Sequence, residues 1–97
     1  MTDTVLVKQM PAFKRVYKKL HSRSRAVVDE AIRAIIADPE MGEDKKGDLA
    51  GVFVYKFKVN HQQMLLAYEW NPGERILLML GAHENFYRDL KQTLPHH

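Results

Sequence analysis

Five side chains in the second half of this 97-residue chain could together cleave a phosphodiester bond. They are two lysines, a histidine, a tyrosine and an arginine: Lys56, Lys58, His83, Tyr87 and Arg88. Cutting RNA without a metal needs a base for the 2′-hydroxyl proton, a cation or donor for the phosphorane charge, and an acid for the leaving 5′-oxygen. The products are a 2′,3′-cyclic phosphate and a 5′-hydroxyl. These residue types predict such a site, with neither metal nor cofactor.

Each side chain suits one of these tasks. His83 is the best candidate for proton transfer, because histidine has an unperturbed pKa of about 6.5. Tyr87 could stack on a base or donate a proton, and Arg88 could contact phosphate through two hydrogen bonds. Lys56 and Lys58 would bind phosphate, because two ammonium groups so close repel each other unless an anion lies between them. The structural alternatives are solvated charge for the lysines, a surface histidine at a helix start and a packing tyrosine.

Four further side chains could assist the reaction. Lys45 and Lys46 fall in a loop before the lysine strand, where they would contact phosphate or remain solvated. Glu84 and Glu69 are possible bases. Glu84 is equally suited to a helix N-terminus, or to an ion pair with Arg88 four residues later.

The composition, 45% hydrophobic and 28% charged, is that of an ordinary globular protein, and we expect residues 1–97 to form one domain. No apolar run approaches the roughly 18 residues of a membrane helix, and the first residues do not resemble a secretory signal. We therefore expect a cytoplasmic protein with no membrane partner. The absence of cysteine excludes a disulfide scaffold, a thiolate nucleophile and sulfur-bound zinc. His96 and His97 could belong to an expression tag and are given no function.

The basic residues are concentrated near the start of the chain. Residues 1–25 hold seven of the 15 Lys and Arg residues and one Asp. Such a patch would attract nucleic acid or an acidic protein partner, or would simply be a solvated helix face.

The spacing of apolar residues predicts the elements that position these side chains. The expected order is a strand over 4–9, helices over 11–20 and 22–38, a loop over 40–50, strands over 52–59, 62–70 and 75–80, and a helix over 84–92. The short connections make the last three strands antiparallel. This order predicts an α+β fold in which an N-terminal helical hairpin packs on a mainly antiparallel four-stranded sheet.

Alternation along the 52–59 strand separates two faces. Phe53, Tyr55 and Phe57 share one face and would pack on the helices. Lys56 and Lys58 would then lie side by side on the other face, which we expect to be open.

The chain resembles the RelE/ParE superfamily of bacterial type II toxin–antitoxin toxins over nearly its whole length. Three segments carry the resemblance: KGDLAG at 46–51, VYKFK at 54–58 and GAHENFY at 81–87. The first is similar to the approach to the second strand in many members, and the second to the lysine strand of messenger-RNA endonucleases. The resemblance implies the fold described above and a cognate antitoxin partner, through which alone the toxin would contact operator DNA.

The resemblance also implies roles for single residues. Lys56 and Lys58 would bind phosphate and stabilise charge, His83 would be catalytic, and Tyr87 would stack on substrate or transfer a proton. The chain departs from the family at 64–66, where Met-Leu-Leu stands near the position at which the endonucleases usually carry an arginine. Either an arginine after the sheet or a loop lysine replaces that cation, or the chain does not cut RNA as its relatives do.

Three functions fit these residues. The first is a ribosome-associated messenger-RNA endonuclease that inhibits translation until its antitoxin binds. The alternative is a ParE-like, non-hydrolytic inhibitor of DNA gyrase that blocks replication, because one fold hosts both activities. A third possibility is a relative that binds only its antitoxin and DNA.

Overall fold

The computed structural model describes residues 4–94, so that His96 and His97 lie outside the described residues. Its elements are β1 (Leu6–Gln9), α1 (Pro11–Tyr17), α2 (Ser22–Ala37), η1 (Pro39–Met41), β2 (Glu43–Asp44), η2 (Gly47–Leu49), β3 (Phe53–Val59), β4 (Gln62–Asn71), β5 (Glu74–Ala82) and α3 (Phe86–Thr93). None of the helices within residues 4–94 is long and apolar enough to cross a membrane.

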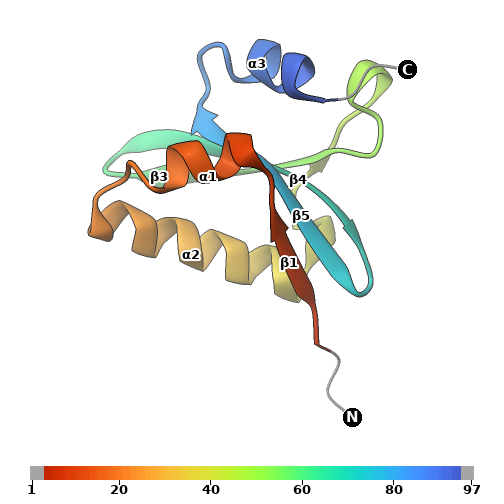
Figure 1. Ribbon diagram of the computed structural model, residues 1–97, viewed down its shortest axis with the longest axis horizontal. Coiled ribbons are helices and arrows are strands. Elements are labelled where there is room, and N and C mark those ends of the chain that lie inside the picture. Colours follow the sequence, from red (N-terminus) through yellow and green to blue (C-terminus); the bar gives the residue numbers. More distant parts are fainter. Residues whose placement is uncertain (1–3, 95–97) are drawn as a thin grey trace.

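The strands form one sheet in the order β1-β5-β4-β3-β2 (Figure 1). The pairings from β2 to β5 are antiparallel, and β1 runs parallel to β5. The predicted α+β class is thus confirmed, with a helical hairpin on a mainly antiparallel sheet. The predicted number of four strands is wrong, because Glu43–Asp44 adds a fifth strand within the stretch expected to be a loop.

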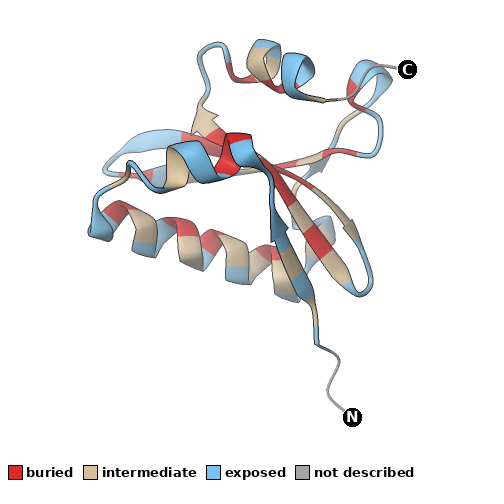
Figure 2. Cartoon of the chain, in the orientation of Figure 1, coloured by how far each residue is buried: buried red, intermediate tan, exposed pale blue. Residues whose placement is uncertain are grey.

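The helical hairpin packs on the face of β3 that the alternation predicts. Phe53, Tyr55 and Phe57 contact a core that contains Phe13 of α1 and Ile35 of α2. Figure 1 shows α2 below the sheet and α3 above it. The middle of β4, Met64–Tyr68, is buried between these layers, whereas β1 is largely exposed (Figure 2).

The expectation of an open second face is wrong. A second core lies there, in which Leu49 of η2 and Phe86 and Leu90 of α3 pack on the sheet. These three residues lie in two short segments that are far apart in the sequence. No long stretch of periodic apolar residues therefore predicts this second layer. The two lysines of β3 are therefore exposed beside a covered region of the sheet.

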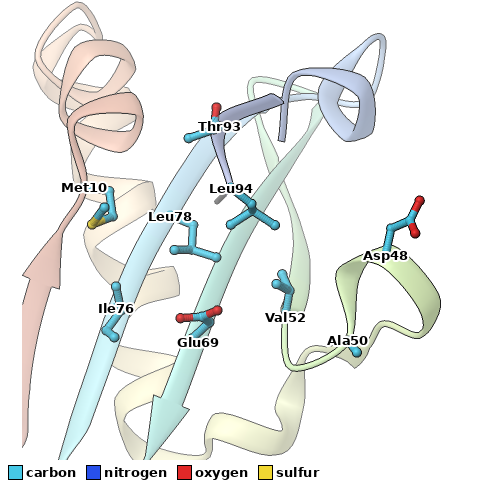
Figure 3. Close-up of a pocket in the computed structure, with 9 residues that line it drawn as sticks. All are labelled: Met10, Asp48, Ala50, Val52, Glu69, Ile76, Leu78, Thr93 and Leu94. Atoms are coloured by element: carbon cyan, nitrogen blue, oxygen red, sulfur yellow. The ribbon is translucent and has the colours of Figure 1, made fainter. Parts of the chain in front are cut away.

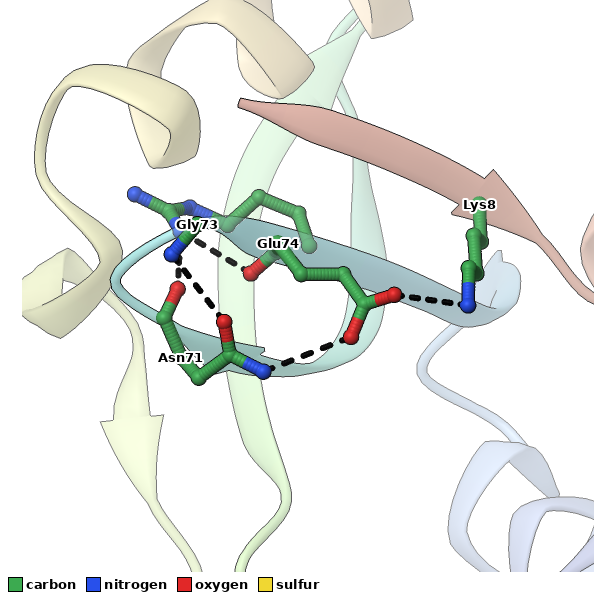
Figure 4. Close-up of polar contacts among 5 residues, drawn as sticks. Lys8, Asn71, Gly73 and Glu74 are labelled. Atoms are coloured by element: carbon green, nitrogen blue, oxygen red, sulfur yellow. Dashed lines mark hydrogen bonds and ion pairs between the residues drawn. The ribbon is translucent and has the colours of Figure 1, made fainter. Parts of the chain in front are cut away.

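Both predicted hairpin turns are present. Asn60 and His61 have φ values of 51° and 68°, which is the backbone of a two-residue type I′ turn. In the next turn the side-chain oxygen of Asn71 accepts a hydrogen bond of 3.0 Å from the Gly73 amide (Figure 4). These turns fix the antiparallel register of β3, β4 and β5.

Arg75 of β5 ties the sheet to the end of α2. Its side chain is 3% exposed and donates hydrogen bonds of 2.9 Å to the carbonyl oxygens of both Ile35 and Ile36. Two further bonds go to the carbonyl oxygens of Asn71 and Glu74. The last turn of a helix leaves carbonyls without donors inside the helix, and a guanidinium with five N–H groups can satisfy several of them.

Candidate functional site

The two lysines of β3 mark the edge of the site. Both are exposed and lie on the α3 side of the sheet, the side to which Val54 also points. Lys56 pairs across the ladder with Leu65, which in turn pairs with Gly81. Two strand spacings separate Lys56 from Gly81, or about 10 Å. Lys56, Leu65 and Gly81 therefore form a row across the sheet, from β3 to the segment that carries His83.

The chain turns sharply after β5, and this turn orients His83 and Tyr87. Asn85 has a φ of 63°, a left-handed conformation that asparagine tolerates better than most residues. The next residue, Phe86, is 2% exposed and fits against Gly81, where an added Cβ would lie 3.4 Å from the Phe86 ring. With Phe86 buried, His83 and Tyr87 meet edge to face, their ring centroids 6.0 Å apart at 78°.

Lys45 joins this pair from the other edge of the sheet. Its Nζ atom lies 4.8 Å from the centroid of the Tyr87 ring and 2.9 Å from the Glu43 carboxylate. The Lys45 side chain is 19% exposed, so the ammonium is half enclosed. Burial alone would lower the pKa of Lys45, but its interactions with Glu43 and Tyr87 outweigh that effect and raise the pKa. Lys45 is therefore a fixed cation that cannot act as a base near neutral pH.

Glu43 belongs to the same cluster. The hydrogen bond and charge of Lys45 hold the pKa of the Glu43 carboxyl below its ordinary value, and Lys56 lowers it further. Glu43 pairs with Val54 across the ladder, two residues before Lys56 on the same face of β3. The carboxylate is thus ionised between two lysines, and it holds Lys45 in place.

The buried Tyr68 of β4 anchors the strand that carries Glu43. Its hydroxyl donates a 2.7 Å hydrogen bond to the Pro39 carbonyl oxygen and accepts one of 3.1 Å from the Gly42 amide. A Cβ on Gly42 would come within 2.6 Å of that hydroxyl oxygen, so only glycine fits without displacement. From there the Lys45 amide bonds the Val52 carbonyl oxygen and continues the edge of the sheet.

The structure does not bring the remaining predicted residues into this cluster. Lys46 is 85% exposed and pairs with Asp44, although it follows Lys45 in sequence. Arg88 is 66% exposed and pairs with its neighbour Asp89 at 3.5 Å. Lys58 lies one row beyond Lys56, opposite Gln63.

Neither predicted carboxylate base lies at the cluster. Glu84 precedes α3, which begins at Phe86 instead of residue 84, so the suggested pairing of Glu84 with Arg88 on one helix is wrong. Glu69 lies four residues along β4 from Leu65, about 13 Å away, in a pocket that Ile76 and Leu78 also line. Within residues 4–94, no three histidine, aspartate or glutamate side chains are grouped so that they could hold a metal ion.

The sequence analysis missed Glu43 because a two-residue strand has too little alternation to be recognised. A signal was nevertheless present. Glu43 and Lys45, like Asp44 and Lys46, are opposite charges two residues apart, the spacing at which side chains of an extended segment share a face. Both pairs form ion pairs, at 2.9 Å and 3.3 Å.

Comparison with known proteins gives one family and a group of similar folds. The family model for the ParE-like toxin of type II bacterial toxin-antitoxin systems matches residues 7–91. The fold is similar to that of a double arginine-to-alanine mutant of the E. coli toxin RelE in the free state, with a TM-score of 0.73 and 12% identity over 95% of this chain and 99% of that chain. No curated protein matches the sequence.

Two toxin–antitoxin complexes contain similar chains. One is RelBE2 from Mycobacterium tuberculosis, with a TM-score of 0.68 and 21% identity over 82% of this chain and 99% of that chain. The other is the intact E. coli RelBE complex, with a TM-score of 0.66 and 14% identity over 84% and 99% of the two chains. Identities this low establish a common fold and say nothing of shared activity.

Proposed function

The chain belongs to the ParE-like toxins of type II bacterial toxin–antitoxin systems, and we propose that it acts as a ribosome-associated messenger-RNA endonuclease. A cognate antitoxin would neutralise it, as the complexes of RelBE and RelBE2 suggest for a chain of this fold. The observation that carries the proposal is the cluster of Glu43, Lys45, Tyr87 and His83, which gathers an ion pair, a phenol and an imidazole at one exposed edge of the sheet.

The cluster offers the services that metal-free RNA cleavage needs. Lys45 stays protonated, so its ammonium can stabilise the charge of the phosphorane. The messenger-RNA endonucleases that this chain resembles usually carry an arginine near positions 64–66, where this chain has the buried residues Met64, Leu65 and Leu66. Lys45 would take the place of that arginine, as the sequence suggested for a loop lysine. His83 is exposed beside Tyr87 and can exchange a proton with the reacting oxygens.

Substrate contacts would extend the site along β3. Lys56 and Lys58 are exposed on the same face and would hold neighbouring phosphates, and the exposed Lys46 and Arg88 would contact the message further out. The Tyr87 ring already has Lys45 against it and could stack on a base or donate a proton. Positioning of the message by the ribosome would supply much of the remaining barrier reduction. The ends produced would be a 2′,3′-cyclic phosphate and a 5′-hydroxyl.

The alternative is inhibition of DNA gyrase without hydrolysis. Two observations favour it: the matching family is named for ParE, and β4 carries no cation toward the site. In that case the cluster would be part of a protein-binding surface, and single changes within it would have modest effects.

A pulse of expression in a bacterial host separates the two functions. Methionine and thymidine incorporation are followed side by side, and the 5′ ends of a reporter message are mapped. The endonuclease predicts an early fall in methionine incorporation with new cuts inside translated codons, both lost in His83→Ala. His21→Ala is the matched control, because His21 is also exposed and makes no capping hydrogen bond at α2. An early fall in thymidine incorporation, with uncut message and full toxicity of His83→Ala, would support the gyrase alternative instead.

A further inference from the structure

A hollow lies on the α3 side of the sheet, at the opposite end of α3 from Tyr87. It has a volume of about 390 Å³, within the range of ligand sites. Its apolar walls come from Val52, Ile76, Leu78 and Leu94, the last of these directly after α3 (Figure 3). The proposed RNA site uses none of these residues.

A carboxylate lies in the middle of this apolar surface. Figure 3 shows the Glu69 side chain between Ile76 and Val52, below Leu78 and Leu94. Glu69 is half-buried and takes part in none of the ion pairs formed among residues 4–94. A carboxylate with apolar neighbours gains more from a nearby cation than one in open water, because the attraction is less screened.

The lysine best placed to reach Glu69 is already engaged. Lys8 of β1 pairs across the ladder with Ile76, which pairs with Glu69, so the three residues form one row. The Lys8 ammonium instead contacts the Glu74 carboxylate at 2.7 Å, and Asn71 donates to the other oxygen of the same group (Figure 4). The pKa of Glu74 is lowered, first by its hydrogen bond with Lys8. Glu74 is thus paired with Lys8, whereas Glu69 has no cation partner among residues 4–94.

The rim of the hollow is also acidic and apolar. Asp48 contributes a second carboxylate at the rim, paired only at 3.7 Å with Lys91. Met10 forms another wall and is 41% exposed. Met10 follows β1 and Val52 precedes β3, so the hollow crosses three strand spacings of the sheet, or about 14 Å. The apolar surface beside Glu69 is therefore wider than one small amine can cover, and it fits several residues of a polypeptide.

We propose that this hollow binds a basic side chain presented between apolar residues of a polypeptide partner. The ammonium or guanidinium would contact Glu69, the apolar stem of the side chain would lie on Ile76 and Leu78, and flanking apolar residues would cover Met10 and Leu94. The chain carries a net charge of +3, yet this surface presents the carboxylates of Glu69 and Asp48, which are complementary to a basic side chain. The inference goes beyond the proposed function, since it does not depend on RNA cleavage.

Matched tripeptides test this proposal on the full chain. The probes are acetyl-Leu-Lys-Leu-amide and two analogues with norleucine or glutamate at the centre, titrated at constant ionic strength while amide shifts are followed by NMR. Shifts should concentrate at Ile76, Leu78 and Leu94. The lysine peptide should bind at least about fivefold more tightly than the norleucine peptide, the difference that one modest charge pair makes. Equal affinities, or shifts concentrated elsewhere, would overturn the proposal.

Two variants locate the charge responsible. Glu69→Gln should reduce the lysine peptide to the affinity of the norleucine peptide, whereas Asp48→Asn, the matched control, should retain most of the preference. The same spectra report whether each variant is folded. A lysine preference that survives in Glu69→Gln would also overturn the proposal. If a variant does not fold, the titrations of the unsubstituted chain still test the proposal.

Discussion

Replacing Tyr68 by phenylalanine tests how the sheet positions the proposed catalytic cation. The change keeps the ring, which is fully buried, and removes only the hydroxyl that bonds Pro39 and Gly42. Each lost hydrogen bond costs about 1 kcal/mol net, and partial access of water to the two backbone groups reduces the sum. We therefore expect the free energy of unfolding to fall by about 1–2 kcal/mol, and the melting temperature to fall by about 4–8 °C for each kcal/mol.

Urea denaturation gives the free energy directly, with the single tryptophan, Trp70, as the fluorescent probe. Tyr55→Phe is the matched control, because Tyr55 is a half-buried tyrosine of the same core whose hydroxyl makes no hydrogen bond within the described residues. Tyr68→Phe should also weaken the contact of Lys45 with Tyr87, visible as a shift of the Lys45 amide by NMR. Equal stability of the two variants, or a Tyr68→Phe loss below about 0.5 kcal/mol, would refute the anchoring role.

Three further predictions concern the framework of the site. The pKa of Glu43 is lowered by Lys45, so this pair should stabilise the fold above the ordinary pKa of a glutamate, about 4.3, and the contribution should disappear as pH falls through the lower folded pKa. Carboxyl ¹³C titration measures that pKa, and Lys45→Met should raise it toward the ordinary value; an unchanged pKa would mean that the ion pair does not persist in solution. Gly42→Ala should destabilise the chain more than Tyr68→Phe does, because the new Cβ would collide with the Tyr68 hydroxyl, and equal urea midpoints would contradict this. Arg75→Lys should cost about 2–4 kcal/mol in urea denaturation, because one ammonium cannot replace four hydrogen bonds, and a loss under about 1 kcal/mol would show that the carbonyls find other donors.

Local patterns predicted most of the fold. Period-two alternation identified the face of β3 that packs on the helices, and turn residues such as Asn60 and Gly73 marked both hairpins. Two helix boundaries were less exact: α1 ends at Tyr17, not 20, and α3 begins at Phe86, not 84. At α3 the left-handed backbone of Asn85, with a φ of 63°, immediately precedes the first helical residue.

The wrong expectations have a common physical cause. The fifth strand is held by the buried Tyr68 hydroxyl, and the second core is assembled from Leu49, Phe86 and Leu90. In each case residues far apart in sequence create the feature. The burial of Arg75 could not be predicted from the sequence either. A basic residue in a strand is usually exposed, and only the fold shows that this one lies buried against the end of α2.

For the site, sequence reasoning named most of the side chains without their grouping. His83 and Tyr87 lie together and Lys45 lies against Tyr87, a grouping that the sequence did not predict for Lys45, whereas Lys46 and Arg88 pair with other residues. The orientation of a loop lysine depends on which strand the loop joins, and only the fold supplies that information.

The most direct test of the central claim compares two neighbouring lysines in a purified translation reaction with ribosomes stalled on a defined message. Lys45 is held against Tyr87 by Glu43, whereas Lys46 is 85% exposed and serves as the matched control. Single-turnover cleavage by Lys45→Met should be about 10²–10³-fold slower than by the unsubstituted chain, the usual cost of one preorganised group that stabilises transition-state charge. Lys46→Met should cleave at nearly the full rate. Equal rates for the two variants, or no cleavage by the unsubstituted chain, would contradict the account.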